Sequence, residues 1–151
     1  KQALILLMGE YESLLAGSYT PAGRQNLLYG STLAGMVIAN TGTTPVHGMG
    51  YSLTYFHGVP HGRANGLLLP NFLKECEKIW KGSTAKVYDA LGMDAQEFAQ
   101  KIKALLGRHK KLPEETLRDY AARAAKNKNV RNCRVPFNEE SLYAVLKRSV
   151  G

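Results

Sequence analysis

Apolar residues recur every three to four positions along most of the chain, which is the period of an amphipathic helix. The strict alternation of apolar and polar residues that indicates a half-buried strand is nearly absent. The predicted helices cover residues 2–16, 23–40, 46–55, 61–78, 83–91, 94–106, 113–126 and 139–149. We therefore predict one all-α domain over residues 1–151, without internal repeats or low-complexity linkers.

Glycine, proline and capping residues set the ends of these helices. Thr44 followed by Pro45 is typical of a capping residue and a first-turn proline. Residues 58–60, Gly-Val-Pro, should break the chain, and Pro70 should bend or divide the helix that follows. The sequence Asp-Ala-Gln-Glu at 94–97 predicts a capping box.

Length and composition indicate an ordinary globular domain. The chain has 151 residues, of which 44% are hydrophobic, enough for a buried core. The longest apolar stretch, residues 27–39, is too short to span a membrane and contains small residues, so we expect a buried helix there. Two cysteines, Cys76 and Cys133, and no secretory signal pattern predict a reduced, cytoplasmic protein.

The two ends of the chain differ. Lys1 begins directly on a helical pattern, with no initiator methionine and no capping residue before it. Gly151, by contrast, follows the last amphipathic stretch as a helix-terminating glycine does. We expect the chain to be the back part of a longer protein, truncated on its N-terminal side.

Positive charge is concentrated in the last third. Residues 1–100 carry seven Lys/Arg and seven Asp/Glu, whereas residues 101–151 carry thirteen and five. A basic surface of this kind attracts nucleic acid or phosphate-bearing ligands, although a solvated helical surface is the simpler reading. Residues 126–134 lack the aromatic residues that stack on bases and predict a loop. A basic helical nucleic-acid-binding module, or a structural assembly module, remains the alternative function.

Three histidines lie in one glycine-rich segment, VHGMGYSLTYFHGVPHG. His57 and His61 are four residues apart, but the glycine and proline between them break the helical turn, so we expect His57 in a loop. His47 and His61 instead lie at the starts of successive predicted helices. The positive end of a helix favours a neutral imidazole, which can bind a metal. The alternative is that both are polar residues satisfied by hydrogen bonds.

Residues 29–70 resemble the metal-binding segment of the iron-containing (group III) alcohol dehydrogenases. The shared pattern includes Ala-Gly, Asn-x-Gly, Val-His and then Pro-His-Gly-x-Ala-Asn before Leu-Leu-Pro. The resemblance implies that His47 and His61 are the third and fourth metal ligands. The family's first two ligands, an aspartate and a histidine four residues apart, have no counterpart here and are expected before Lys1.

The resemblance also implies an architecture and an activity. The chain would be the C-terminal helical metal-binding domain of a dehydroquinate-synthase-like two-domain enzyme, whose absent α/β domain binds NAD or NADP. The enzyme would interconvert a small alcohol and its aldehyde or ketone, with Fe(II), or Zn(II) as a substitute, as the Lewis acid. The chain alone is predicted to be inactive. We expect no membrane partner and regard nucleic acid as an unfavoured partner, and self-association into a homo-oligomer is a further possibility.

Tyr51 departs from the family pattern. Many family members have a histidine four residues after the ligand that matches His47, close to the substrate. Tyr51 stands there and should face the same side of the helix as His47. Its hydroxyl could hydrogen-bond the alcohol or a water molecule, although a phenol is a poorer proton relay at neutral pH than an imidazole. The alternative is that Tyr51 only forms a wall of the site.

Overall fold

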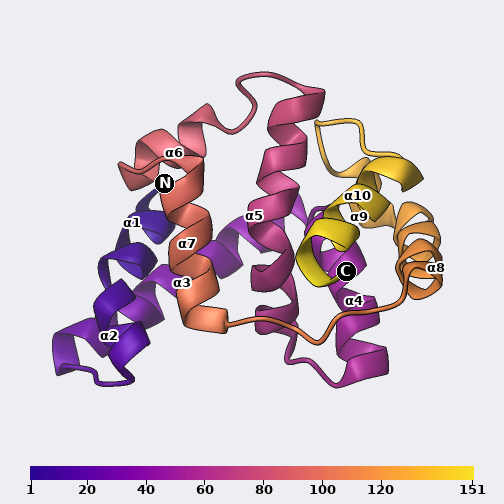
Figure 1. Ribbon diagram of the computed structural model, residues 1–151. Helices are drawn as coiled ribbons and strands as arrows, with labels where there is room; N and C mark the ends of the chain where they lie inside the picture. Colours follow the sequence, from indigo (N-terminus) through magenta and orange to yellow (C-terminus); the bar gives the residue numbers. More distant parts are fainter.

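The computed structural model describes residues 1–151 as ten helices without a strand, so the all-α prediction is confirmed (Figure 1). The helices are α1 (Gln2–Gly9), α2 (Tyr11–Ala16), α3 (Pro21–Thr41), α4 (Pro45–His57), α5 (His61–Ile79), α6 (Ala85–Leu91), α7 (Ala95–Leu106), α8 (Glu114–Ala125), α9 (Lys128–Arg131) and α10 (Glu139–Val150). None of them combines the length and the apolar character that crossing a membrane requires.

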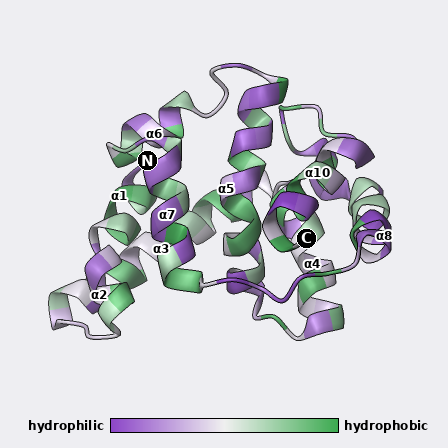
Figure 2. Ribbon diagram, in the orientation of Figure 1, coloured by the Kyte–Doolittle hydropathy of each residue, from purple (hydrophilic) through white to green (hydrophobic).

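The hydrophobic core lies between α4, α5, α8 and α10, which pack against one another. Its largest fully buried side chains come from these four helices: Met49, Leu53, Leu68, Leu117, Leu142, Val145 and Leu146. Hydrophobic and hydrophilic segments alternate along α5 in Figure 2, as expected of a helix that buries one face. The core therefore holds α4 and α5, the two histidine-bearing helices, in fixed positions.

The predicted helix ends are confirmed in part. The side chain of Asp94 accepts a hydrogen bond from the backbone N–H of Glu97 at 2.8 Å and begins α7, but the Glu97 side chain does not return the bond, so the predicted capping box is half formed. Pro45 is the first residue of α4, but the side chain of Thr44 makes no capping hydrogen bond. Asn138 and Ser141 form a reciprocal capping box at the start of α10.

Pro70 does not divide its helix, since α5 runs from His61 to Ile79 with the proline inside it. Buried side chains flank the proline on both sides, with Leu68 before it and Phe72 and Leu73 after it. Burial of these side chains offsets the backbone hydrogen bond that a proline cannot donate. Tertiary packing therefore keeps the helix continuous across Pro70.

The first predicted helix, residues 2–16, is split in two at Glu10. The Glu10 carboxylate accepts hydrogen bonds from Ser13 Oγ at 3.2 Å and from Asn26 Nδ2 of α3 at 2.8 Å. The second bond ties the break to α3, a contact sixteen residues away that periodicity cannot reveal.

The expected buried helix at residues 27–39 is wrong. In α3, which passes behind α7 in Figure 1, only Gly23 and Gly30 are buried. The exposed apolar side chains of this helix are Leu28, Tyr29, Met36, Val37 and Ile38. The helix packs closely against α1 alone, so most of its surface has no neighbour within this chain.

The predicted loop at residues 126–134 also needs correction, because it contains the short helix α9. The side chain of Asn127 accepts a hydrogen bond from the backbone N–H of Asn129 at 3.0 Å and begins this helix. Its four residues are too few to leave a clear period in the sequence. The turn matters for the site because it buries Asn129 beside α4.

Candidate metal centre

His47 and His61 meet although fourteen positions separate them. His47 lies in the first turn of α4 and His61 is the first residue of α5. Gly58 ends α4 in the left-handed conformation, with φ of 63°, so that three residues suffice to connect the helices. The Nδ1 atom of His47 lies 3.0 Å from the Nε2 atom of His61, and the ring centroids are 5.0 Å apart.

Asn65 lies within hydrogen-bond distance of both rings. It lies one helical turn after His61 on α5, and its Nδ2 atom is 3.2 Å from His47 Nδ1 and 3.1 Å from His61 Nε2. Its Oδ1 atom is buried without a hydrogen-bond partner. Sequence reasoning assigned Asn65 no role, although its spacing of four from His61 places it on the same helix face.

Gly50 makes room for this amide. A Cβ atom at Gly50 would collide with the Oδ1 atom of Asn65. A Cβ atom added at Gly48, in the same helix, would make only ordinary van der Waals contacts, the nearest with Asn127 Cβ at 3.7 Å. Of the two α4 glycines, Gly50 is therefore the one on which the position of Asn65 depends.

The electrostatics favour a neutral imidazole at His47. Burial lowers the pKa of His47, and the neighbouring His61 lowers the pKa further because two positive charges would repel. A neutral imidazole keeps one ring nitrogen with a free lone pair, which is the form that binds a metal. No group of three or more His, Cys, Asp or Glu side chains gathers around the pair or elsewhere in the chain.

The distance between the nitrogens fits two ligands of one ion. Nitrogens that each lie about 2.1 Å from a metal are about 3.0–3.4 Å apart at bond angles between about 90° and 110°. The observed 3.0 Å lies within this range. The unpartnered Oδ1 atom of Asn65 adds a polar group with nothing to bind beside the same nitrogens. The residues present can therefore supply two imidazole ligands to one ion.

Tyr51 lies next to this pair, one turn after His47. Its ring stacks on His61, with centroids 5.4 Å apart and planes 13° from parallel. Its hydroxyl oxygen accepts a hydrogen bond of 3.5 Å from Nδ2 of Asn129, and 45% of the residue is exposed. The structure thus places the ring of Tyr51 against His61 and its hydroxyl toward α9.

His57 takes part in a different contact. It is the last residue of α4 and not part of a loop as predicted, because Gly58 terminates the helix one residue later. Its Nε2 atom lies 2.8 Å from the hydroxyl oxygen of Tyr120 in α8, and its ring meets that of His109 edge to face. His57 is therefore not brought together with His47 and His61.

Two further residues of the resembling segment have local roles. Asn40 donates from Nδ2 to the backbone carbonyl of Met36 at 2.7 Å, within its own helix. The backbone carbonyl of Thr43 accepts a hydrogen bond of 3.2 Å from Asn132 Nδ2, so the segment before α4 is tied to the end of α9. Neither side chain joins the histidine pair.

Comparison with known proteins gives a family match. The model of the Fe-containing alcohol dehydrogenase family, C-terminal, matches residues 1–150. The chain is 37% identical over 73 residues to lactaldehyde reductase of Escherichia coli K12, and 36% identical over 70 residues to 1,3-propanediol dehydrogenase of Citrobacter freundii. These alignments cover 48% and 46% of this chain but 19% and 18% of the relatives.

Solved structures extend the likeness to the whole chain. An iron-containing alcohol dehydrogenase from Thermotoga maritima superposes with a TM-score of 0.84 at 25% identity, over 99% of this chain and 40% of the other. A 1,3-propanediol oxidoreductase shares the fold, with a TM-score of 0.76 at 22% identity over 98% of this chain and 43% of the other. The chain belongs to the iron-containing alcohol dehydrogenase family and corresponds to its C-terminal helical domain.

Proposed function

We propose that the chain supplies half of the metal site of a cytoplasmic, NAD(P)-dependent alcohol dehydrogenase, with His47 and His61 as two ligands of Fe(II). The approach of His47 Nδ1 to His61 Nε2 at 3.0 Å carries this proposal, together with membership of the family. An aspartate and a histidine from outside this chain would complete the set. Zn(II) also accepts such a mixture of carboxylate and imidazole ligands.

The chain's own residues would hold and orient the ligands. His47 and His61 would each direct one nitrogen toward a common point, and Asn65 lies beside both, with its Nδ2 atom 3.2 Å and 3.1 Å from these nitrogens. Tyr51 stacks against His61 and limits the rotation of its ring. The metal, when bound, acts as a Lewis acid that favours the alkoxide form of an alcohol.

The nicotinamide cofactor and most of the substrate contacts would come from outside this chain. The chain spans about 40% of the length of the iron-containing alcohol dehydrogenase from Thermotoga maritima. With two of four ligands, we expect the chain alone to bind metal weakly and to have no dehydrogenase activity. The substrate class would be a small alcohol, oxidised to its aldehyde or ketone by hydride transfer to NAD or NADP.

Anaerobic calorimetric titration with Fe(II) and Zn(II) tests this proposal. We expect binding weaker than micromolar in the chain alone, and its loss in His61→Ala. His57→Ala is the matched control, because it also removes one imidazole but leaves the His47–His61 contact intact. Submicromolar binding by the chain alone would contradict the half-site proposal. Equal losses in both variants would contradict the assignment of His61 as a ligand.

A further inference from the structure

A second site lies away from the histidine pair, in a cavity of about 410 Å³. It is bordered by α5, by α7, by the loop at residues 107–111 and by the end of α10. Neither His47 nor His61 lines it. A volume of this size is within the range of pockets that hold small molecules.

The charged side chains of the lining are all cationic. The cavity is lined by Lys103, Arg108, Lys111 and Arg148, and by no aspartate or glutamate side chain. Arg148 is already neutralised, because its guanidinium lies 2.5 Å from the buried carboxylate of Glu75. The other three cations form no ion pair in the structure.

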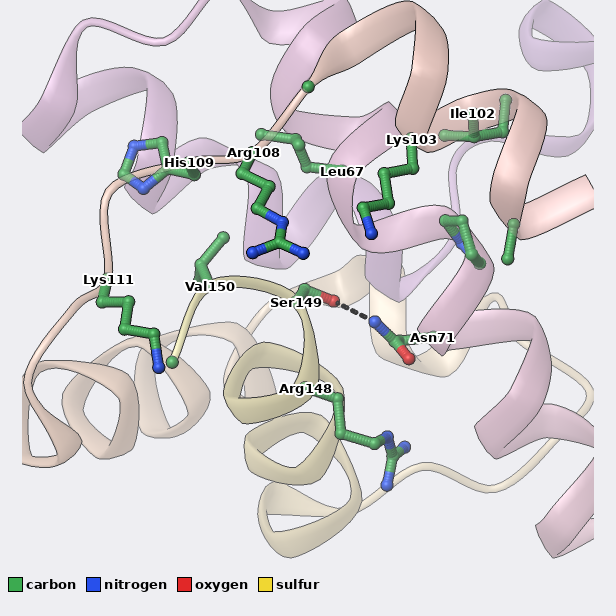
Figure 3. A pocket seen from close by; sticks show the side chains of 14 residues that line it. Leu67, Asn71, Ile102, Lys103, Arg108, His109, Lys111, Arg148, Ser149 and Val150 are labelled. Atoms are coloured by element: carbon green, nitrogen blue, oxygen red, sulfur yellow. Dashed lines mark hydrogen bonds between the residues drawn. The ribbon is translucent and has the colours of Figure 1, made fainter. Parts of the chain in front are cut away.

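Two of the free cations point to one place. Figure 3 shows the side chains of Lys103 and Arg108 directed toward the hydrogen bond between Asn71 and Ser149, whereas Arg148 points away. Asn71 Nδ2 donates to Ser149 Oγ at 3.0 Å, so the hydroxyl hydrogen of Ser149 remains free to donate to a ligand. An ammonium, a guanidinium and a hydroxyl donor thus face the same space.

Helix dipoles explain only part of this pattern. Lys103 lies in the last turn of α7 and Arg148 in the last turn of α10, where cations stabilise the negative end of a helix. Arg108 and Lys111 lie in the loop after α7 and have no such partner. Their loop is nevertheless held in place, because Gly107 N donates to Lys103 O at 2.9 Å and Leu112 N donates to Val150 O at 2.8 Å.

The apolar part of the lining comes from Leu67, Ala99, Ile102 and Val150, with Pro70 beside them, and His109 also borders the cavity. A cavity lined by both apolar side chains and cationic donors fits a ligand that has an apolar part and an anionic group. We propose that this cavity binds a small organic phosphate, whose phosphate group meets Lys103, Arg108 and Ser149 and whose apolar part lies on Leu67 and Ile102. The planar fork of Arg108 suits two phosphate oxygens at once.

Calorimetric titration of the chain with adenosine 5′-monophosphate tests the site, with inorganic phosphate and a 20-nucleotide single-stranded DNA as further probes. We expect saturable one-to-one binding of the nucleotide, weaker binding of inorganic phosphate, and a loss of at least about tenfold in nucleotide affinity in Arg108→Gln. Arg108→Lys, which keeps the charge but not the fork, should lose less.

Lys110→Gln is the matched control, since it removes one positive charge from the same loop at a residue that does not line the cavity. Circular dichroism would establish that each variant is folded, which we expect because Arg108 and Lys110 are both exposed. Equal losses in Lys110→Gln and Arg108→Gln would overturn the proposal in favour of diffuse attraction. Absence of saturable nucleotide binding would also overturn it. Tighter binding of the DNA, with the same dependence on Arg108, would mean a nucleic-acid surface instead.

Discussion

Two apolar helices of this molecule differ in how much of their surface is buried. In α4, seven of thirteen residues are buried, and they pack on α5, α8 and α10. In α3, which is longer at 21 residues, only two glycines are buried, and Val37 and Leu28 are 59% and 69% exposed. The difference is one of neighbours, since α4 packs on four helices, α5, α8, α9 and α10, whereas α3 packs closely on α1 alone. An apolar run therefore indicates a surface that needs a partner, and not by itself a buried position.

The largest difference should appear when one leucine is truncated in each region. Leu146→Ala in α10 removes a side chain with no exposed surface, and we expect a loss of about 2–5 kcal/mol in the free energy of unfolding. Leu28→Ala in α3 should change it by no more than about 0.5 kcal/mol. Urea denaturation followed by circular dichroism measures both. Similar losses in the two variants would show that α3 is packed as tightly as the core.

A smaller effect is expected at the ion pair that joins two core helices. Glu75 of α5 is 3% exposed and is bound by Arg148 of α10 at 2.5 Å, with Lys78 at 3.4 Å. Arg148→Ala leaves this buried carboxylate short of a donor, so we expect a loss of about 1–3 kcal/mol in the free energy of unfolding. Glu75→Gln should cost less, because the amide is uncharged and Arg148 can turn to solvent. A lower denaturation midpoint in Glu75→Gln than in Arg148→Ala would contradict this account.

The exposed face of α3 should influence assembly more than stability. We expect the double variant Leu28→Glu and Val37→Glu to reduce self-association of the chain, with little change in its unfolding midpoint, because both side chains already lie in solvent. Sedimentation at several concentrations measures the association. The matched control, Gln96→Glu with Gln100→Glu, adds the same charge to exposed positions of α7. Unchanged association in the α3 variant would show that this face does not drive contacts between copies.

The smallest effect concerns pH and the turn that links α5 to α6. Hydrogen bonds from the backbone of Gly82 at 2.7 Å and from the side chain of Thr84 at 2.8 Å lower the pKa of Glu77 from its ordinary value of 4.5. The resulting stability is present above the unfolded-state pKa and is lost as pH falls through the lowered folded-state pKa. Since α6 packs on α1, this turn connects the core to the N-terminal helices.

Glu77→Gln should therefore weaken the dependence of the unfolding midpoint on pH below about 4.5. Thermal melts of both proteins between about pH 3 and pH 7 would show this as a smaller fall of the unfolding midpoint at acid pH in the variant. Glu97→Gln is a suitable control, because the exposed Glu97 has only the 3.9 Å contact with Lys101. An unchanged acid limb in Glu77→Gln would mean that the turn does not depend on this carboxylate.

Local signals in the sequence predicted most helices because their causes are local. Asp94 and Asn138 lie within three residues of the N–H groups they cap, and Gly58 ends α4 within its own turn. Two of the errors have distant causes. The break at Glu10 depends on Asn26, and the continuity of α5 through Pro70 depends on side chains buried against other helices.

The candidate site divides in the same way. The helix starts at His47 and His61, and the resemblance to a metal-binding segment, followed from sequence alone. The approach of their nitrogens to 3.0 Å and the placement of Asn65 between them required the packing of α4 on α5. The stacking of Tyr51 on His61 and the contact of His57 with Tyr120 could not be predicted from the sequence either.

The sequence by itself determined most of the helices, some of their caps and the family, because propensity and motif spacing act over a few residues. Only the tertiary structure decided which apolar faces are buried and which polar groups meet. It left the apolar face of α3 uncovered, and it gathered Lys103, Arg108 and Ser149 from three elements around one cavity. These outcomes depend on contacts between residues far apart in the chain, and the free energy of such contacts is not encoded in any short segment.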